Sequence, residues 1–115
     1  MASLSSNPNN MPTQPFIEQL RTLGKTVLPK DASLWLYGSQ ARGEATEDSD
    51  WDLLILLNKE KREFEDLGRY ASPFTEMGFD NNEYVMPIIY TRKEWASMYF
   101  MPFAKNVEQD KIVLV

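Results

Sequence analysis

Two acids one residue apart, Asp50 and Asp52, stand where a polar loop passes into the apolar run 53–57. Successive side chains in a strand point to opposite faces, so these two carboxylates are expected on one face, roughly 7 Å apart along the chain. Side-by-side carboxylates repel one another unless a cation lies between them, and hard oxygen ligands of this kind suit Mg²⁺. The pair is therefore a candidate metal site.

A Gly-Ser turn lies just upstream of the two acids. Gly38 and Ser39 follow the apolar run 34–37, and residues 39–42 can form about one helical turn. Glycine lets the backbone approach an anion closely, and a helix that begins there points its free N–H groups at the anion. A phosphate-binding turn beside a paired-acid metal site indicates chemistry on a nucleoside triphosphate.

The order of these residues resembles the minimal nucleotidyltransferases of the DNA polymerase beta superfamily. Their signature is Gly-Ser, a short variable stretch, and then Asp-x-Asp on a strand. Here the signature corresponds to Gly38-Ser39, ten intervening residues, and Asp50-Trp51-Asp52, with Arg42-Gly43 and Ser49 matching its flanks. The resemblance implies a nucleotidyltransferase-like fold for the chain.

The resemblance also implies roles for five of these residues. Asp50 and Asp52 would be catalytic and hold Mg²⁺, as one ion or two. Gly38, Ser39 and Arg42 would bind the substrate, ATP or another nucleoside triphosphate. For Arg42 an ordinary surface charge is an equal alternative to a role in the turn or at the phosphates.

The third carboxylate of the site is the open question. Members of this superfamily place another acid on a later strand, where it takes the proton from the attacking hydroxyl. The matching run 84–90 has no acid in its middle. Glu83, at its leading end, is the nearest substitute and is our third catalytic candidate, although a solvated acid at a strand entrance is an equal alternative.

Composition limits the remaining classes of function. The 115 residues suffice for one domain, which we expect over residues 13–115 after a disordered tail over 1–12. Without Cys or His, the chain has no disulfide, zinc–histidine site or histidine acid–base catalysis. The net charge of −5 argues against nucleic acid as a substrate, because binding its backbone requires Lys and Arg. No apolar run approaches the ~20 residues of a membrane span, so we expect a cytoplasmic protein.

Alternating helical and strand patterns predict an α/β (α+β) fold with one small mixed sheet. Helices are expected over 13–28, 59–77 and 102–110, and strands over 34–37, 51–57, 84–90 and 112–115. The second helix would turn Phe64, Leu67, Ala71 and Phe74 inward, and Gly78 would end it. Pro87 indicates an edge strand or a bulge, and Thr91 begins a capping box.

A run of large apolar residues near the end of the chain allows two interpretations. Such residues are more often core, but a domain of this size can hardly bury all of them together with its sheet. We therefore expect some of them to form a surface for a protein partner. They are Trp95, Met98, Tyr99, Phe100, Met101 and Phe103.

Three hypotheses about function follow, and they belong to different classes. The first is a stand-alone enzyme that transfers a nucleoside monophosphate, AMP from ATP, to a hydroxyl of a HEPN-domain-like partner protein, as the antitoxin of such a pair. The second is a catalytically reduced module that acts on its partner by contact. The third, transfer to a small molecule such as an aminoglycoside, ranks last because the chain lacks an acceptor-binding helical lobe. The sequence leaves the acceptor and the oligomeric state open.

Overall fold

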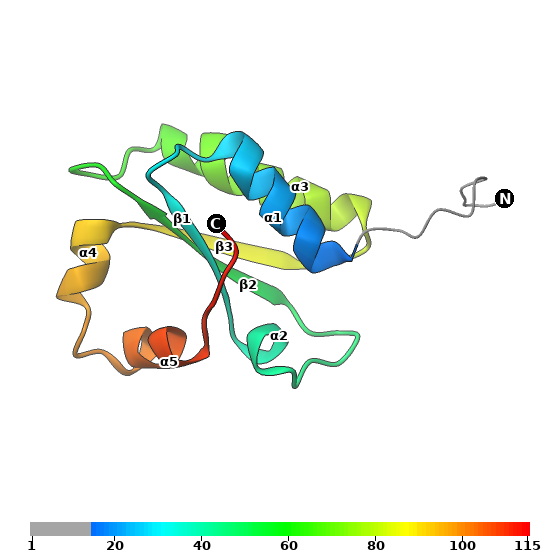
Figure 1. Cartoon of the computed structure of the whole chain (residues 1–115). Helices are drawn as coiled ribbons and strands as arrows, with labels where there is room; N and C mark the ends of the chain where they lie inside the picture. Colours follow the sequence, from blue (N-terminus) through cyan, green and yellow to red (C-terminus); the bar gives the residue numbers. More distant parts are fainter. Residues whose placement is uncertain (1–14) are drawn as a thin grey trace, which may run out of the picture.

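The computed structural model describes residues 15–115, which form a four-stranded sheet with helices on both faces (Figure 1). The strands β1 (Ser33–Tyr37), β2 (Trp51–Leu57), β3 (Val85–Thr91) and β4 (Ile112–Val113) lie in the order β3-β2-β1-β4. β1 is antiparallel to β2 and β4, whereas β2 and β3 are parallel. The expected mixed sheet is confirmed, and the predicted tail over 1–12 lies outside the described residues.

The helices lie in two layers. One face of the sheet carries α1 (Phe16–Val27), a π-helical stretch η1 (Leu67–Ala71) and α3 (Ser72–Asp80). The other face carries α4 (Arg92–Ser97) and α5 (Pro102–Asp110), while the short α2 (Ser39–Arg42) follows the end of β1 (Figure 1). No helix within residues 15–115 is long and apolar enough to cross a membrane.

The central strand β2 is covered on both faces. Leu53, Ile55 and Leu57 join the core beneath α1 and α3, and Leu54 and Leu56 join the core beneath α4 and α5. A strand buried on both faces has no polar positions to alternate with apolar ones, which explains the continuous apolar run. β2 therefore holds its first residues, including Asp52, in a fixed position.

β3 forms one edge of the sheet, as Pro87 predicts. The Tyr84 carbonyl accepts a hydrogen bond of 2.8 Å from the Trp51 N–H. Every second residue from Tyr84 onward, beginning with Met86, therefore turns its backbone N–H and C=O toward β2. Val85, Pro87 and Ile89 thus turn theirs outward. Proline is tolerated because its missing N–H falls on the unpaired side of the strand.

The predicted helix over 59–77 is wrong in its first third. Phe64 is 87% exposed and Leu67 is 53% exposed, whereas Ala71 and Phe74 are buried as expected. The helical pattern does not reach back to residue 59, because a buried acid fixes a loop there.

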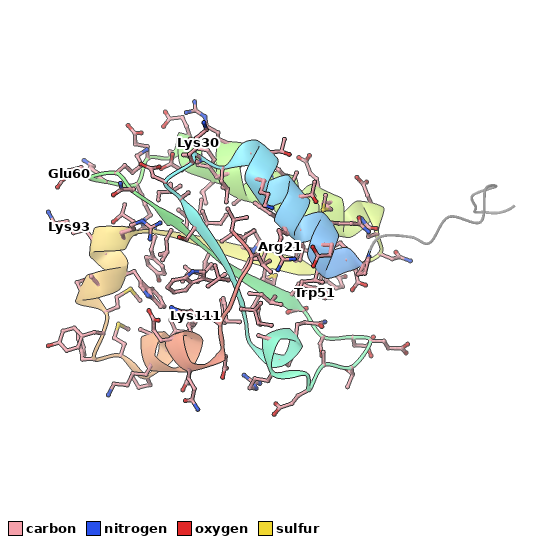
Figure 2. The ribbon with its side chains drawn as sticks, in the orientation of Figure 1. Arg21, Lys30, Trp51, Glu60, Lys93 and Lys111 are labelled. Carbon is pink, nitrogen blue, oxygen red and sulfur yellow. The ribbon has the colours of Figure 1, made fainter. Side chains whose placement is uncertain are left out.

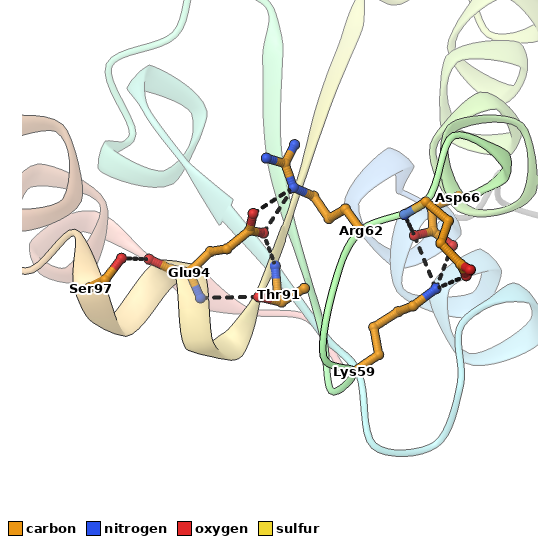
Figure 3. Close-up of polar contacts among 7 residues, drawn as sticks. Lys59, Arg62, Asp66, Thr91, Glu94 and Ser97 are labelled. Carbon is orange, nitrogen blue, oxygen red and sulfur yellow. Dashed lines mark hydrogen bonds and ion pairs between the residues drawn. The ribbon is translucent and has the colours of Figure 1, made fainter.

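That acid is Asp66. Its carboxylate accepts hydrogen bonds from the Glu63 N–H at 2.8 Å and from the Lys59 ammonium at 3.2 Å (Figure 3). These bonds and the positive charge of Lys59 lower the pKa of Asp66, although its burial raises it. A buried carboxylate needs such donors, and providing them keeps residues 59–64 outside the helix, which leaves Phe64 in solvent.

The prediction that Gly78 ends the following helix is also wrong, since α3 continues to Asp80. Gly78 is instead a point of close packing against the start of β3. A Cβ there would lie 2.7 Å from the Glu83 carbonyl oxygen and 2.9 Å from Val85 Cγ2. The chain turns at Asn82, which has a φ of 59°.

The capping box at the end of β3 is confirmed. The Glu94 N–H donates to Thr91 Oγ1 at 3.0 Å, and the Thr91 N–H donates to Glu94 Oε1 at 2.8 Å (Figure 3). Arg62 donates to both oxygens of the same carboxylate, at 2.8 and 3.0 Å. One glutamate therefore caps α4 and fastens the loop before η1 to it.

The aromatic and methionine cluster between α4 and α5 divides into two groups. Trp95 is buried, and Met98 and Phe103 pack against the same core. The other three members, Tyr99, Phe100 and Met101, are exposed.

Candidate functional site

The turn from β1 into α2 depends on Gly38. This residue has φ 77° and ψ −159°, a conformation that is essentially restricted to glycine. A Cβ at Gly38 would also collide with the carboxylate of Asp52. Gly38 therefore lies directly against Asp52, the second acid of the pair.

The first N–H groups of α2 are available at this turn. The Ala41 and Arg42 N–H groups donate to the Gly38 carbonyl, each at 3.1 Å. Within residues 15–115, the N–H groups of Ser39 and Gln40 have no protein acceptor. Such free donors are a feature of anion-binding turns.

Asp50 and Asp52 come together on the same face of β2. Burial raises the pKa of the Asp52 carboxyl, the charge of Asp50 raises it further, and the charge of Arg42 partly opposes them. In the described part of the chain, neither carboxylate accepts a hydrogen bond or forms an ion pair. Two neighbouring carboxylates without protein donors are the donor set that a hard divalent cation prefers.

Tyr37 is a residue of this site that sequence reasoning missed. It pairs with Asp52 across the β1–β2 ladder, so its side chain lies on the Asp52 face. Burial, and then the charge of Asp52, raise the pKa of the Tyr37 hydroxyl to about 12, and its ring packs on Phe103 with centroids 5.7 Å apart. The signal in the sequence was its place directly before Gly38, at the end of the apolar strand.

Arg42 lies near the site but is already paired. It donates to Glu44 Oε1 at 2.9 Å and to Asp110 Oδ2 at 2.8 Å, and these bonds raise the pKa of its guanidinium. Asp110 ends α5, so the arginine links the turn to the last helix. Among the predicted alternatives, this arrangement matches stabilisation of the turn.

Glu83 is turned away from the acid pair. Its carboxylate accepts a hydrogen bond of 3.1 Å from the indole N–H of Trp51, whose side chain lies on the α1 face of β2 and stacks edge-on against Phe16 (Figure 2). Asp52 lies on the opposite face because side chains alternate along the strand. The role of Glu83 as proton acceptor stays a prediction, and to fill it the side chain would have to release Trp51.

Met86 occupies the place beside Asp52 on β3. The two residues are register partners in the parallel β2–β3 ladder, so their side chains share a face. Met86 is 52% exposed. Within residues 15–115 there is no cluster of three acidic or other metal-binding side chains that could hold an ion, so the acid pair stands by itself.

Replacing Gly38 by alanine tests its contact with Asp52. Gly43 is a matched control, because it also has a positive φ (73°) but has open space where a Cβ would lie. We expect Gly43→Ala to lower the free energy of unfolding by about 1 kcal/mol, from backbone strain. Gly38→Ala should lower it by about 3 kcal/mol, because strain and collision add. Urea denaturation measures both, and equal losses would contradict the close approach.

The raised pKa of Asp52 predicts a pH-dependent effect of Asp52→Asn. A carboxyl whose pKa is higher in the folded than in the unfolded state costs stability as the pH rises through these two values. Without metal, Asp52→Asn should therefore be more stable than the wild type at about pH 7, and the difference should vanish at about pH 3. Urea denaturation in a chelator tests this, and a less stable variant at neutral pH would refute it.

The fold of the chain is similar to that of a solved structure. That structure is described as a toxin-antitoxin with AMP-PNP, and the match has a TM-score of 0.59 at 14% sequence identity. It covers 86% of this chain and 72% of the other, and at this identity it establishes a shared fold alone. No curated protein sequence matches the chain.

A family comparison agrees with the geometry. The sequence model of the nucleotidyltransferase domain matches residues 16–114, which include every strand, every helix and all the candidate site residues. By this match over most of its length, the chain belongs to the nucleotidyltransferase domain family.

Proposed function

We propose that this protein binds a nucleoside triphosphate with Mg²⁺ between the Gly38-Ser39 turn and the acid pair, and transfers the nucleoside monophosphate to a hydroxyl group. The observation that carries the proposal is the pair of carboxylates without protein donors, lying against a turn with free N–H groups. ATP is the substrate we favour.

The donor set at the site fits Mg²⁺. Asp50 and Asp52 supply carboxylate oxygens, the repulsion between them is relieved by a cation, and no lysine or arginine forms an ion pair with either one within the described chain. When bound, the ion would neutralise phosphate charge and polarise the phosphoryl group.

The residues of the chain itself hold and orient the substrate. The N–H groups of Ser39 and Gln40 and the Ser39 hydroxyl donate to phosphate oxygens, and Gly38 leaves room for the phosphates to approach. In the transfer, the acceptor oxygen forms a bond to the α-phosphorus, and the bond from that phosphorus to the bridging oxygen breaks to release pyrophosphate. The acceptor proton passes to Glu83, if this side chain leaves Trp51, or to solvent.

The acceptor we propose is a protein, namely a HEPN-domain-like partner that this chain neutralises. Two observations support a protein acceptor: family membership, and the fold shared with a toxin-antitoxin that was crystallised with a nucleotide analogue. A cytoplasmic location, with ATP and Mg²⁺ at hand, is part of the proposal.

Calorimetry and mass spectrometry test the proposed reaction. Titration with Mg-ATP should give a binding heat that chelator and Asp52→Asn both abolish, because the carboxylate pair would no longer hold the cation. Incubation with Mg-ATP and the HEPN-domain partner should add one nucleotide to the partner. Asp80→Asn removes an exposed carboxylate at the end of α3, outside the site, and it is the control that should keep binding. No metal-dependent heat from the wild type would overturn the proposal.

A second candidate function is neutralisation of the partner by contact alone. The observation in its favour is Met86, an apolar residue beside Asp52 at the position where an acid could accept the proton. In this alternative, wild type and Asp52→Asn neutralise the partner equally, and neither needs ATP.

Met86→Asp distinguishes the two candidates. If the chain catalyses transfer, a carboxylate at this register position would lie on the face of Asp52 and accept the proton, and the rate of nucleotide transfer should rise about 100-fold. Met86→Asn is the matched control, because asparagine has the shape of aspartate but no charge. It should leave the rate of transfer within about threefold of the wild-type rate. A rate that stays unchanged in the aspartate variant would favour contact alone.

A further inference from the structure

An apolar surface follows the free edge of β3. Of the nine large hydrophobic residues that are exposed in the described chain, five border this strand. Monomeric proteins seldom gather so many exposed apolar side chains in one place without a binding role. We call these five the edge band: Phe64 (87% exposed), Leu67 (53%), Phe79 (68%), Tyr84 (67%) and Met86 (52%).

Both ends of the edge band are hollowed. At the end of β3, a groove of about 550 Å³ lies between the strand residues 87–90 and the loop that carries Phe64 and Leu67. At the start of β3, a smaller hollow of about 130 Å³ is lined by Phe79 and Tyr84. The band therefore offers depressions into which apolar side chains of another molecule can fit.

The groove has a fixed wall. Arg62 is held by both oxygens of Glu94, and its guanidinium lies 5.3 Å from the centre of the Tyr90 ring. Asp66 holds the loop on the other side through Lys59 and Glu63 (Figure 3). Because these contacts fix the loop, Phe64 is presented to solvent in a preformed site, and little order has to be gained on binding.

Charge around the edge band selects the kind of partner. Residues 60–86 carry seven carboxylates and three cations, but Glu60, Glu63 and Asp66 are paired with Lys93 and Lys59, which lie outside this segment. The other four carboxylates form no ion pair within the described chain, so the segment keeps an excess of negative charge. Like charges repel another acidic surface, which counts against nucleic acid, an anionic membrane and a second copy of this chain. A basic protein surface with an apolar stripe is complementary to it.

The edge band leads to the candidate active site. Met86, one of its members, is the register partner of Asp52 on the neighbouring strand, and their side chains share a face. A segment that lies along the band would thus pass beside the acid pair. The exposed residues Tyr99, Phe100 and Met101, between α4 and α5, have no register partner in β2 and no such link.

We propose that the edge band is where the acceptor protein docks, through a basic amphipathic helix that carries the receiving hydroxyl near one end. Apolar residues of this helix fill the two hollows, its cations face the carboxylates of 60–86, and its hydroxyl comes beside Asp52. This inference rests on the proposed function, but it makes a separate claim, because a nucleotide could bind without any partner on this edge.

A labelled peptide tests the docking surface. The probe is a fluorescein-labelled helical peptide of Lys and Leu with one Tyr, and its counterpart has Glu in place of Lys. We expect fluorescence anisotropy to show binding of the Lys peptide alone, weakened by raising the salt from about 50 to about 500 mM. With Mg-ATP, the Tyr of the bound peptide should gain a nucleotide.

Paired variants locate the binding surface. Phe64→Ser with Tyr84→Ser removes one phenylalanine and one tyrosine from the edge band and should weaken peptide binding about tenfold or more. Tyr99→Ser with Phe100→Ser removes the same two residue types from the other exposed group and should weaken it less than about twofold. Equal weakening by both pairs, or a larger effect of the second pair, would overturn the proposal.

Two further measurements separate the outcomes. Calorimetry should give the same affinity for Mg-ATP in the wild type and in both double variants. If the wild type does not bind Mg-ATP, the proposed function is refuted. The peptide-binding data would still test the docking surface in that case. Sedimentation should show the wild type as a monomer. A wild-type dimer that the Phe64→Ser and Tyr84→Ser pair dissociates would make the band a self-interface and overturn the proposal.

Discussion

Two carboxylates, Asp50 and Asp52, are held side by side at the start of a buried strand, with no protein cation or donor bound to either in the described chain. Burial of Asp52 and then its repulsion by Asp50 raise the pKa of the Asp52 carboxyl, and both cost stability when this carboxyl is ionised. The fold can hold the pair because β2 is fixed from both faces by two apolar cores. The rest of the site depends on this arrangement, since a cation that relieves the repulsion also attracts phosphate.

The same constraint explains the residues around the pair. Gly38 lies so close to Asp52 that no side chain fits, and the N–H groups of Ser39 and Gln40, which follow it, have no acceptor within the described chain. Arg42 is near enough to lower the pKa of Asp52, yet its bonds go to Glu44 and Asp110. The arginine therefore fixes the turn without neutralising the pair, and the pair stays available to a metal ion.

Local sequence patterns predicted the strands, the Gly-Ser turn and the capping box because each depends on neighbouring residues. The boundaries of α2, β2 and α5 agree with the structure for this reason. The inward placement of Phe64 was wrong because the helix begins only after it, and that of Leu67 was wrong because the chain is π-helical there, which changes the spacing of side chains around the axis. The spacing of apolar residues shows neither the polar contacts of Asp66 nor the π-helical turn.

The third acid could not be judged from the sequence for a different reason. The face on which a β3 side chain lies depends on the register of β3 against β2, and a shift of one residue moves every side chain to the other face. The register pairs Met86 with Asp52 and leaves Glu83 with Trp51. Pairings between strands that are far apart in sequence have no local signal.

Because β3 lies at the edge of the sheet, the exposed apolar surface along it reaches the acid pair. A strand at the centre of the sheet would bury Met86, whereas at the edge it leaves an apolar side chain exposed directly beside Asp52. Pro87 removes a backbone donor from that edge, so another strand cannot add to it with a full ladder of hydrogen bonds. The edge of β3 therefore pairs poorly with other strands. A partner would have to bind through the exposed apolar side chains and the carboxylates instead. In the proposed complex, a partner bound by such side chains would be positioned by apolar contacts and charge, and the same contacts would bring its hydroxyl to the acid pair.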